Sequence, residues 1–407
     1  MIKRFLLLFT LAIPLLCDAQ SNKIDEGTIQ IHSDNDGRFS NLATLNENFK
    51  DVRVVTLGEQ THFDGATFDA KIQLVKYLHE KLGFNILAFE SGYFDCSKAA
   101  ELLASGNAKG ILKEAVFGVW DNKSLAELEE YILLTQNTPA PLIVTGFDVQ
   151  FSGSLSKKFL FEDLTAHLKN ISASEIINDP DWINFESALQ RQIKYSNFYK
   201  KPSAIDTSLI GKFSRRISGF IANDANAATE DKNGFWLKVI SNLRNDSKRR
   251  FSEENFRDSI MADNLFNLVE QRFKNDKVIC WGATSHFIYN QKAIKSKEYE
   301  TFVPMGEYLH QRLKKTLFTI GFTSYKGKAG SIITHKLKEP PKHSYEDLLG
   351  EKGYAYAFTS FRTAVANEQI GAEIESRLLG NRFQFMDLAH VVDGIFYIET
   401  AFPPRMK

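Results

Sequence analysis

Short apolar runs alternate with an amphipathic helical pattern along the first part of the chain, and this alternation restricts the fold more than any other feature. The runs at 53–57 and 85–89 are typical of buried strands. Between them, apolar residues recur at helical spacing over 68–82, and Gly83 provides a stop for that helix. A strand, a helix and a strand joined by short connections favour a right-handed crossover within a parallel sheet.

The alternation continues, with one long interruption, through the rest of the chain. Further elements are predicted as strands at 142–145, 277–281 and 394–398, a hairpin near a sheet edge at 317–325 and 331–337, and a helix that begins at a capping box of Ser124 and Glu127. The remaining segments are a polar surface lead-in at 20–50 and a helical insertion at about 155–270. We therefore expect one α/β domain over 20–407, with a three-layer α/β/α fold, a mainly parallel sheet and that insertion.

Composition and charge exclude several classes of partner. The chain has 407 residues, of which 43% are hydrophobic and 25% are charged, as in a water-soluble globular protein. Lys and Arg number 50, and so do Asp and Glu, so no overall field attracts DNA, RNA or an anionic membrane surface. We expect no nucleic-acid partner.

The N-terminus has the pattern of an export signal. Lys3 and Arg4 precede the apolar run 5–16, and Ala19 lies at a suitable cleavage position. We predict a signal peptide over 1–19 and a periplasmic or secreted protein, with lipidation at Cys17 and an uncleaved anchor as less favoured alternatives. Because no later apolar run is long enough for a bilayer, we expect no stable membrane insertion after cleavage.

Cleavage would leave two cysteines, Cys96 and Cys280, in the mature chain. Cys280 lies in an apolar run that is typical of a buried strand. We therefore predict two unpaired core thiols, although an exported protein could also pair them.

Titratable side chains follow four of the predicted strands, at the point where each strand ends. They are Glu59 and His62, Glu90, Asp148, and His286. In open parallel sheets, sites form at the carboxyl ends of the strands, so we expect these side chains to share a site. A histidine can take a proton from water, and a neighbouring carboxylate can orient its ring, as hydrolysis requires.

Familiar hydrolytic and nucleotide-binding motifs are missing from the sequence. It has no Gly-x-Ser-x-Gly elbow, no His-Glu-x-x-His pair, no phosphate-binding loop and no Gly-x-Gly-x-x-Gly fingerprint. We expect no cofactor. However, the same carboxylates and histidines are also potential metal ligands, so a divalent metal that activates water stays open as an alternative.

Several segments resemble the erythromycin esterase family, in family order from about residue 53 to 310. The first is Gly58-Glu59-Gln60-Thr61-His62, which fits the family's Gly-Glu-x-x-His signature. The others are 74–78, 83–90, Trp120-Asp121-Asn122, Gly146-Phe147-Asp148-Val149-Gln150, 257–264, Trp281-Gly282-Ala283 with His286, and 305–309.

The resemblance implies an enzyme that hydrolyses a carboxylic ester or lactone, including macrolide rings, without a covalent intermediate. By resemblance His62 is the general base and Glu59 its partner acid. Further catalytic positions by resemblance are Glu90, His286 and Arg257, and supporting or substrate-binding positions are Asp148, Trp120 and Asp258. Without the resemblance, Arg257 and Asp258 would be interpreted as an ion pair on a helix surface.

Three functions therefore remain open at the level of sequence. The first is a metal-independent esterase whose partner is a small-molecule ester or lactone, for which macrolide antibiotics are one candidate. The second is a metal-dependent hydrolase that uses the same side chains as ligands, with peptides as one candidate substrate. The third is an exported binding protein that keeps the fold without turnover.

Overall fold

The computed structural model describes residue 24 and residues 26–106, 109–197, 200–224, 230–251, 255–362 and 373–406. The predicted signal peptide lies outside these residues, so export and the cleavage site stay predictions. The chain divides into two compact units, one formed by 1–84 with 279–407 and the other by 85–278. None of the helices in the described residues is both long and apolar enough to cross a membrane.

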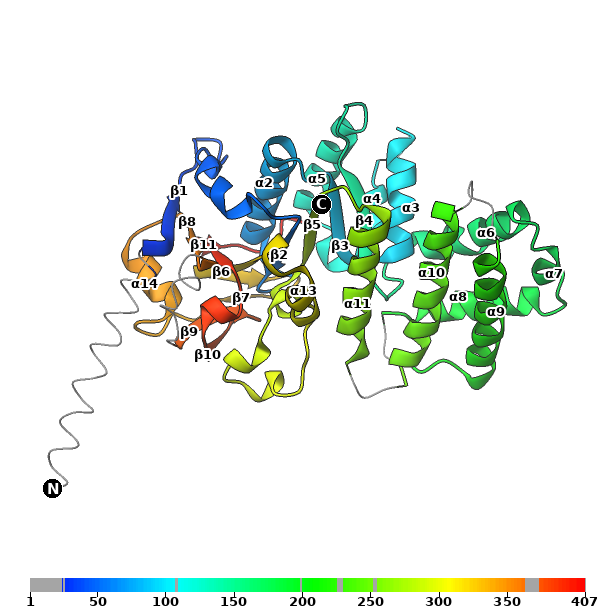
Figure 1. The fold of residues 1–407 in the computed structure, drawn as a ribbon. Coiled ribbons are helices and arrows are strands. Elements are labelled where there is room, and N and C mark those ends of the chain that lie inside the picture. Colours follow the sequence, from blue (N-terminus) through cyan, green and yellow to red (C-terminus); the bar gives the residue numbers. More distant parts are fainter. Residues whose placement is uncertain are drawn as a thin grey trace, which may run out of the picture. The chain divides into compact units, whose positions relative to one another are not determined.

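The first unit contains the larger set of strands (Figure 1). Its strands are β1 (Thr28–Ile31), β2 (Val54–Glu59), β5 (Val278–Ala283), β6 (Leu317–Gly330), β7 (Thr334–Lys336), β8 (Tyr356–Ser360), β9 (Ile374–Leu379), β10 (Arg382–Met386) and β11 (Gly394–Ala401). They run in the order β1-β8-β11-β6-β2-β5, while β7 pairs with β6 and β9 with β10. Both β2 and β11 are parallel to β6, whereas β8 is antiparallel to β1 and β11.

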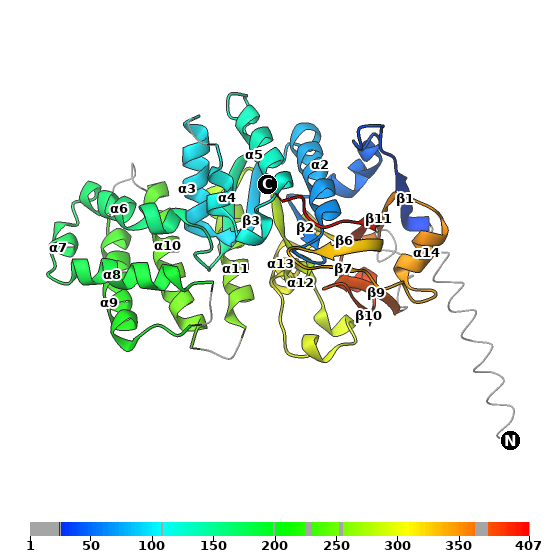
Figure 2. The ribbon, with the colours of Figure 1, turned by 180° about the vertical axis from the view of Figure 1, so that it is seen from behind.

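Helices cover both faces of this part of the sheet. The helix α2 (Gly65–Leu82) packs on β2, β6 and β11, and it is prominent in the reverse view (Figure 2). The other elements are α12 (Thr284–Phe287), α13 (Met305–Leu313), α14 (Tyr345–Glu351), and the short turns η1 (Leu42–Phe49), η5 (Gln291–Ala293), η6 (Lys297–Tyr299), η7 (Lys314–Thr316) and η8 (Leu388–His390).

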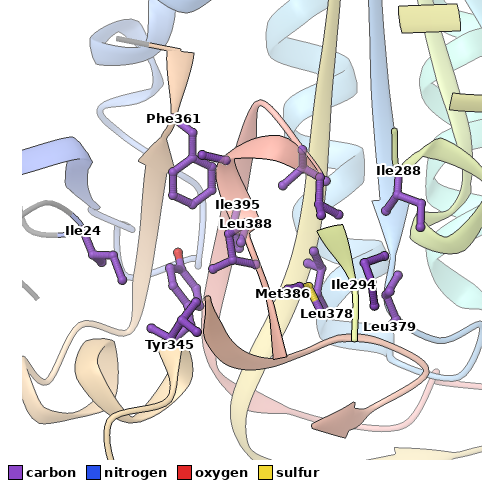
Figure 3. Close-up of a cluster of buried hydrophobic side chains, with 14 of the residues drawn as sticks. Ile24, Ile288, Ile294, Tyr345, Phe361, Leu378, Leu379, Met386, Leu388 and Ile395 are labelled. Atoms are coloured by element: carbon purple, nitrogen blue, oxygen red, sulfur yellow. The ribbon is translucent and has the colours of Figure 1, made fainter. Parts of the chain in front are cut away.

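One hydrophobic core of this unit lies where α14 and the β9–β10 hairpin meet the sheet. Tyr345, Leu378, Met386 and Ile395 are buried together there with other apolar side chains (Figure 3). The burial of a Leu or Ile side chain of this kind is worth roughly 2 kcal/mol, which fixes the hairpin against the sheet.

The second unit is largely helical. Its strands β3 (Ile86–Gly92) and β4 (Ile143–Asp148) are parallel neighbours. Its helical elements are α3 (Tyr93–Ala104), α4 (Ile111–Ala115), η2 (Gly118–Trp120), α5 (Lys123–Thr135), α6 (Leu155–Asn170), α7 (Ser174–Ile177), α8 (Trp182–Lys194), α9 (Ala204–Ala222), α10 (Glu230–Arg249), α11 (Phe256–Asn267) and η4 (Leu268–Arg272). Both α3 and α11 pack on β4, and the helices from α6 to α10 pack mainly on one another (Figures 1 and 2).

The predicted fold class is confirmed, because the strands form a mixed, mostly parallel sheet flanked by helices. The predicted helix at 68–82 is α2, and the C-cap residue Gly83 that follows it has a left-handed φ of 71°. The long segment predicted as helical contains α6 to α11. As predicted, Cys96 and Cys280 are buried and are not paired in a disulfide. Burial raises the pKa of both thiols.

Three local predictions were wrong. The supposed lead-in contains β1, which pairs with β8 across more than 300 residues of sequence. The helix α5 is capped by Asn122, whose side chain accepts from the amide of Leu125, so the capping box does not begin at Ser124. The strand β6 lies inside the sheet and not near its edge, and only its far end forms the predicted hairpin with β7.

Candidate active site

The first unit holds His62 beside a buried carboxylate. The strand β2 continues to Glu59, two residues beyond the predicted end, and His62 follows three residues later in the loop before α2. The His62 Nδ1 lies 3.0 Å from the Glu59 Oε1, and the two side chains are 28% and 0% exposed. The imidazole is therefore open to solvent while its carboxylate partner is not.

The loop that carries His62 is held on several sides. Asp64 caps α2 by accepting from the amides of Ala66 and Thr67. The same carboxylate accepts from the Gln60 side chain at 2.6 Å and from the Ser324 hydroxyl at 3.1 Å. Burial raises the pKa of Asp64, and these hydrogen bonds partly offset that rise.

Two backbone hydrogen bonds fix the loop further. The carbonyl of Gln60 accepts from the amide of Gly380, and the carbonyl of Phe63 accepts from the amide of Gly330. Because the backbone is fixed on both sides of His62, the Cα and Cβ atoms that carry its ring are held in a defined position.

Lys71 completes this cluster, and sequence reasoning missed it. Its fully buried ammonium pairs with the Glu59 Oε2. A signal was available, because a lysine three residues after Phe68 falls on the apolar stripe of the helix, where a charge needs a partner. Asp64 was missed as well, although an aspartate directly before an apolar helical pattern is a common N-cap.

The segment that carries His286 packs against the end of β2. The hydroxyl of Thr284 donates to the carbonyl of Gly58 at 2.5 Å. A Cβ at Gly58 would lie 2.7 Å from the Cα of Thr284, so only glycine permits this approach. The half-buried His286 lies in α12, two residues after Thr284. The structure thus places the two predicted histidines on neighbouring segments of one unit.

The second unit holds a separate cluster around Arg257, at the start of α11. The Arg257 Nη2 donates to the Glu90 Oε1 at 2.8 Å and to the Asp148 Oδ2 at 2.7 Å, and its Nε donates to the Asp148 Oδ1 at 3.1 Å. Both carboxylates are buried, and the arginine side chain is 20% exposed. Burial alone would lower the pKa of Arg257, but the two carboxylates raise it well above its ordinary value.

The ends of β3 and β4 explain how Glu90 and Asp148 converge. The pairing register shifts between Phe89 and Gly92, which is the irregularity that turns side chains at a strand end. A Cβ at Gly146 would lie 2.3 Å from the carbonyl oxygen of Ser91, so glycine allows the two strands to approach there. Arg257 reaches both carboxylates from α11, so its interpretation as a surface ion pair with Asp258 is wrong.

The remaining predicted residues occupy supporting positions. Trp120 is 1% exposed and packs against Phe89, next to Glu90, with ring centroids 6.2 Å apart. Asp258 is buried and accepts from the side chain of Asn255 at 2.9 Å. In the described part of the chain, no group of three or more His, Cys, Asp or Glu side chains has an arrangement suited to a metal ion.

Each unit therefore combines strands of a mainly parallel α/β architecture with buried carboxylates at the strand ends, a common setting for enzymes that act on small molecules. The sequence profile of the erythromycin esterase family matches residues 79–401. The chain belongs to the erythromycin esterase family. The matched region contains Glu90, Asp148, Arg257 and His286, and it begins after Glu59 and His62.

The names of two relatives agree with this assignment. The hydrolase YbfO of Bacillus subtilis (strain 168) is 27% identical over 79% of this chain and 76% of its own length. The erythromycin esterase type II of Escherichia coli is 21% identical over 90% of this chain and 94% of its own. The family and these names identify the chain as a hydrolase.

The fold is shared with proteins of low sequence identity. A Bacillus cereus protein matches with a TM-score of 0.78 at 16% identity, over 96% of this chain and 99% of its own. A succinoglycan biosynthesis protein gives 0.75 at 18%, over 95% and 98%. A mutant of the erythromycin esterase EreC in its open conformation gives 0.61 at 17%, over 89% and 94%.

Proposed function

We propose that this hydrolase cleaves a carboxylic ester or lactone with a water molecule activated by His62, without a covalent intermediate. The observation that carries the proposal is the contact between the His62 Nδ1 and the buried Glu59 Oε1 at 3.0 Å. An ionised carboxylate can only accept a hydrogen bond, so Nδ1 donates and Nε2 keeps the lone pair that takes a proton from water. The partial exposure of the imidazole gives water access to it.

The other residues receive roles in the same reaction. Glu59 would orient the imidazole and stabilise the imidazolium after proton transfer. Glu90 and His286 would position water or return a proton to the leaving oxygen. Arg257, held by two carboxylates, would stabilise the developing oxyanion, because a guanidinium fixed in advance needs no reorganisation during the reaction. The supporting residues are Asp148, Asp258 and Trp120.

The proposed substrate is a small-molecule ester or lactone, and no cofactor is assigned. Two of the matched proteins are named as erythromycin esterases, which makes a macrolide lactone the first compound to test. A simple aryl ester is the second, because it reports general esterase activity with little demand on substrate shape.

The test is incubation of the purified chain with erythromycin, followed by mass spectrometry for the addition of one water, and a parallel assay with the aryl ester. We expect hydrolysis by the wild type, loss of at least 100-fold on His62→Ala, and unchanged activity for His335→Ala, whose imidazole is exposed on β7. Activity should survive a chelator. Hydrolysis by His62→Ala at the wild-type rate would refute the base, and activity that depends on an added divalent metal would favour the metal-dependent alternative.

A further inference from the structure

Lys71 is a fully buried lysine that contacts both the cluster that carries His62 and the segment that leads to His286. Its Nζ pairs with the Glu59 Oε2, lies 3.4 Å from the carbonyl oxygen of Gly282, and lies 4.1 Å from the ring centroid of Trp281. An ammonium without a partner is costly to bury, so this position needs the negative charge of Glu59.

The two oxygens of Glu59 are divided between two partners. One faces the ammonium of Lys71, and the other lies 3.0 Å from the Nδ1 of His62. The carboxylate thus has one side held by a fixed cation and presents the other to the imidazole. A neighbouring cation favours the ionised form of a carboxylate, and only that form is restricted to accepting from Nδ1.

The same ammonium also contacts the strand that leads to the second histidine. Gly282 and Trp281 belong to β5, and His286 follows four residues after Gly282. Lys71 therefore lies between the segment of His62 and the segment of His286, in addition to the hydrogen bond between Thr284 and Gly58.

We propose that Lys71 is a positioning residue for the hydrolysis proposed above. Its ammonium pairs with the Glu59 carboxylate and holds it directed at the Nδ1 of His62, so that the imidazole presents a basic Nε2 to water. Lys71 itself does not touch the substrate, because its side chain is fully buried. This role rests on the proposed function, but its electrostatic part is measurable without any substrate.

The charge of Lys71 distinguishes this role from simple packing. Removal of a nearby positive charge raises the proton affinity of the Glu59–His62 pair, whichever of the two holds the proton. In the first unit, the elements beside this pair also carry Asp64 in the loop and His286 in α12, together with the titratable side chains of α2, which are Asp69, Lys76, Tyr77, His79, Glu80 and Lys81. All of them are present in every variant below, so their contributions are constant in the comparison.

The experiment follows the titration of the His62 imidazole by NMR in the full chain, assigned with His62→Ala. In Lys71→Met we expect its midpoint to rise by about one pH unit or more, whereas Lys71→Arg should stay close to the wild type. The matched control is Lys98→Met, because Lys98 is a largely buried lysine paired with Glu101 and Asp163 at 3.0 Å in the second unit. An unchanged midpoint in folded Lys71→Met would overturn the proposal.

Turnover provides the second measurement. Lys71→Met should lower kcat more than it changes KM, and the acid limb of its pH–rate profile should move to higher pH. In a Glu59→Gln background, Lys71→Met should lower kcat no further, because its partner is already lost. A further loss there would overturn the positioning role. Lys71→Met alone leaves the Glu59 carboxylate buried without its cation, whereas the double variant leaves no such charge. The comparison of the double variant with Glu59→Gln can therefore be made even if Lys71→Met alone does not fold.

The two proposals can fail separately. If the wild type hydrolyses no ester, the proposed function fails, and the His62 titration still decides whether Lys71 controls the pair. If esters are hydrolysed and the titration does not respond to Lys71→Met, only the positioning role fails.

Discussion

Asp95 makes the stability of this protein depend on pH in a way that can be calculated. It is fully buried in the first turn of α3, where its Oδ1 accepts from the amide of Ser156 at 2.8 Å. Burial raises the pKa of this carboxyl from 3.8 to about 7, against the smaller opposing effect of its hydrogen bonds. Between these two pH values the folded chain binds a proton that the unfolded chain does not.

The sign follows from this difference in bound protons. The contribution of Asp95 to the free energy of unfolding is complete below the pKa of the unfolded chain and is lost as pH rises through the folded value of about 7. The shift of about 3 pH units corresponds to roughly 4 kcal/mol, or up to about 1.4 kcal/mol per pH unit.

Asp95→Asn removes this titration while keeping an oxygen that can accept from the amide of Ser156. We expect the stability of the variant relative to the wild type to increase by up to about 4 kcal/mol between pH 4 and pH 7.5. Urea unfolding at several pH values, followed by tryptophan fluorescence, measures the difference. Asp36→Asn is the control, because the Asp36 side chain is 71% exposed. A difference for Asp95→Asn that stays constant over this pH range would refute the reasoning.

Two further predictions concern the Arg257 cluster and the core of the first unit. Arg257→Met should cost about 3–5 kcal/mol at neutral pH, because it leaves two buried carboxylates without their cation. Arg405→Met, which removes an exposed ion pair, should cost less than about 1 kcal/mol in the same thermal unfolding assay, and similar losses for both would contradict the structure. Ile395→Ala should cost about 2–5 kcal/mol through loss of core packing. Ile332→Ala should change stability by less than about 0.5 kcal/mol, because Ile332 is 96% exposed, and equal effects of the two would argue against the buried position of Ile395.

Local patterns in the sequence predicted the elements that depend on neighbouring residues. The apolar stripe and Gly83 identified α2, and the apolar runs identified the strands from β2 to β5. The strands nevertheless extend further than predicted, because β2 ends at Glu59 and β4 at Asp148. Polar residues at strand ends are part of the sheet there, since hydrogen bonds to neighbouring strands decide where a strand stops.

Other elements depend on distant partners and could not be predicted from the local pattern. The short strand β1 exists as an edge strand paired with β8, and the interior position of β11 follows from its pairing with β6 and β8. Pairing between segments so far apart in sequence leaves little local signal, because the same alternation fits an edge or an interior strand.

The sequence by itself determined the residue types of the chemistry and their order along the chain, because acids and histidines directly after apolar runs mark strand ends. It did not determine which atoms meet. Only the tertiary structure decided that Arg257 pairs with Glu90 and Asp148, and that Lys71 and His62 share Glu59. The physical reason is that a buried charge is tolerated only beside a compensating one, and folding brings the compensating residue from another element of the chain.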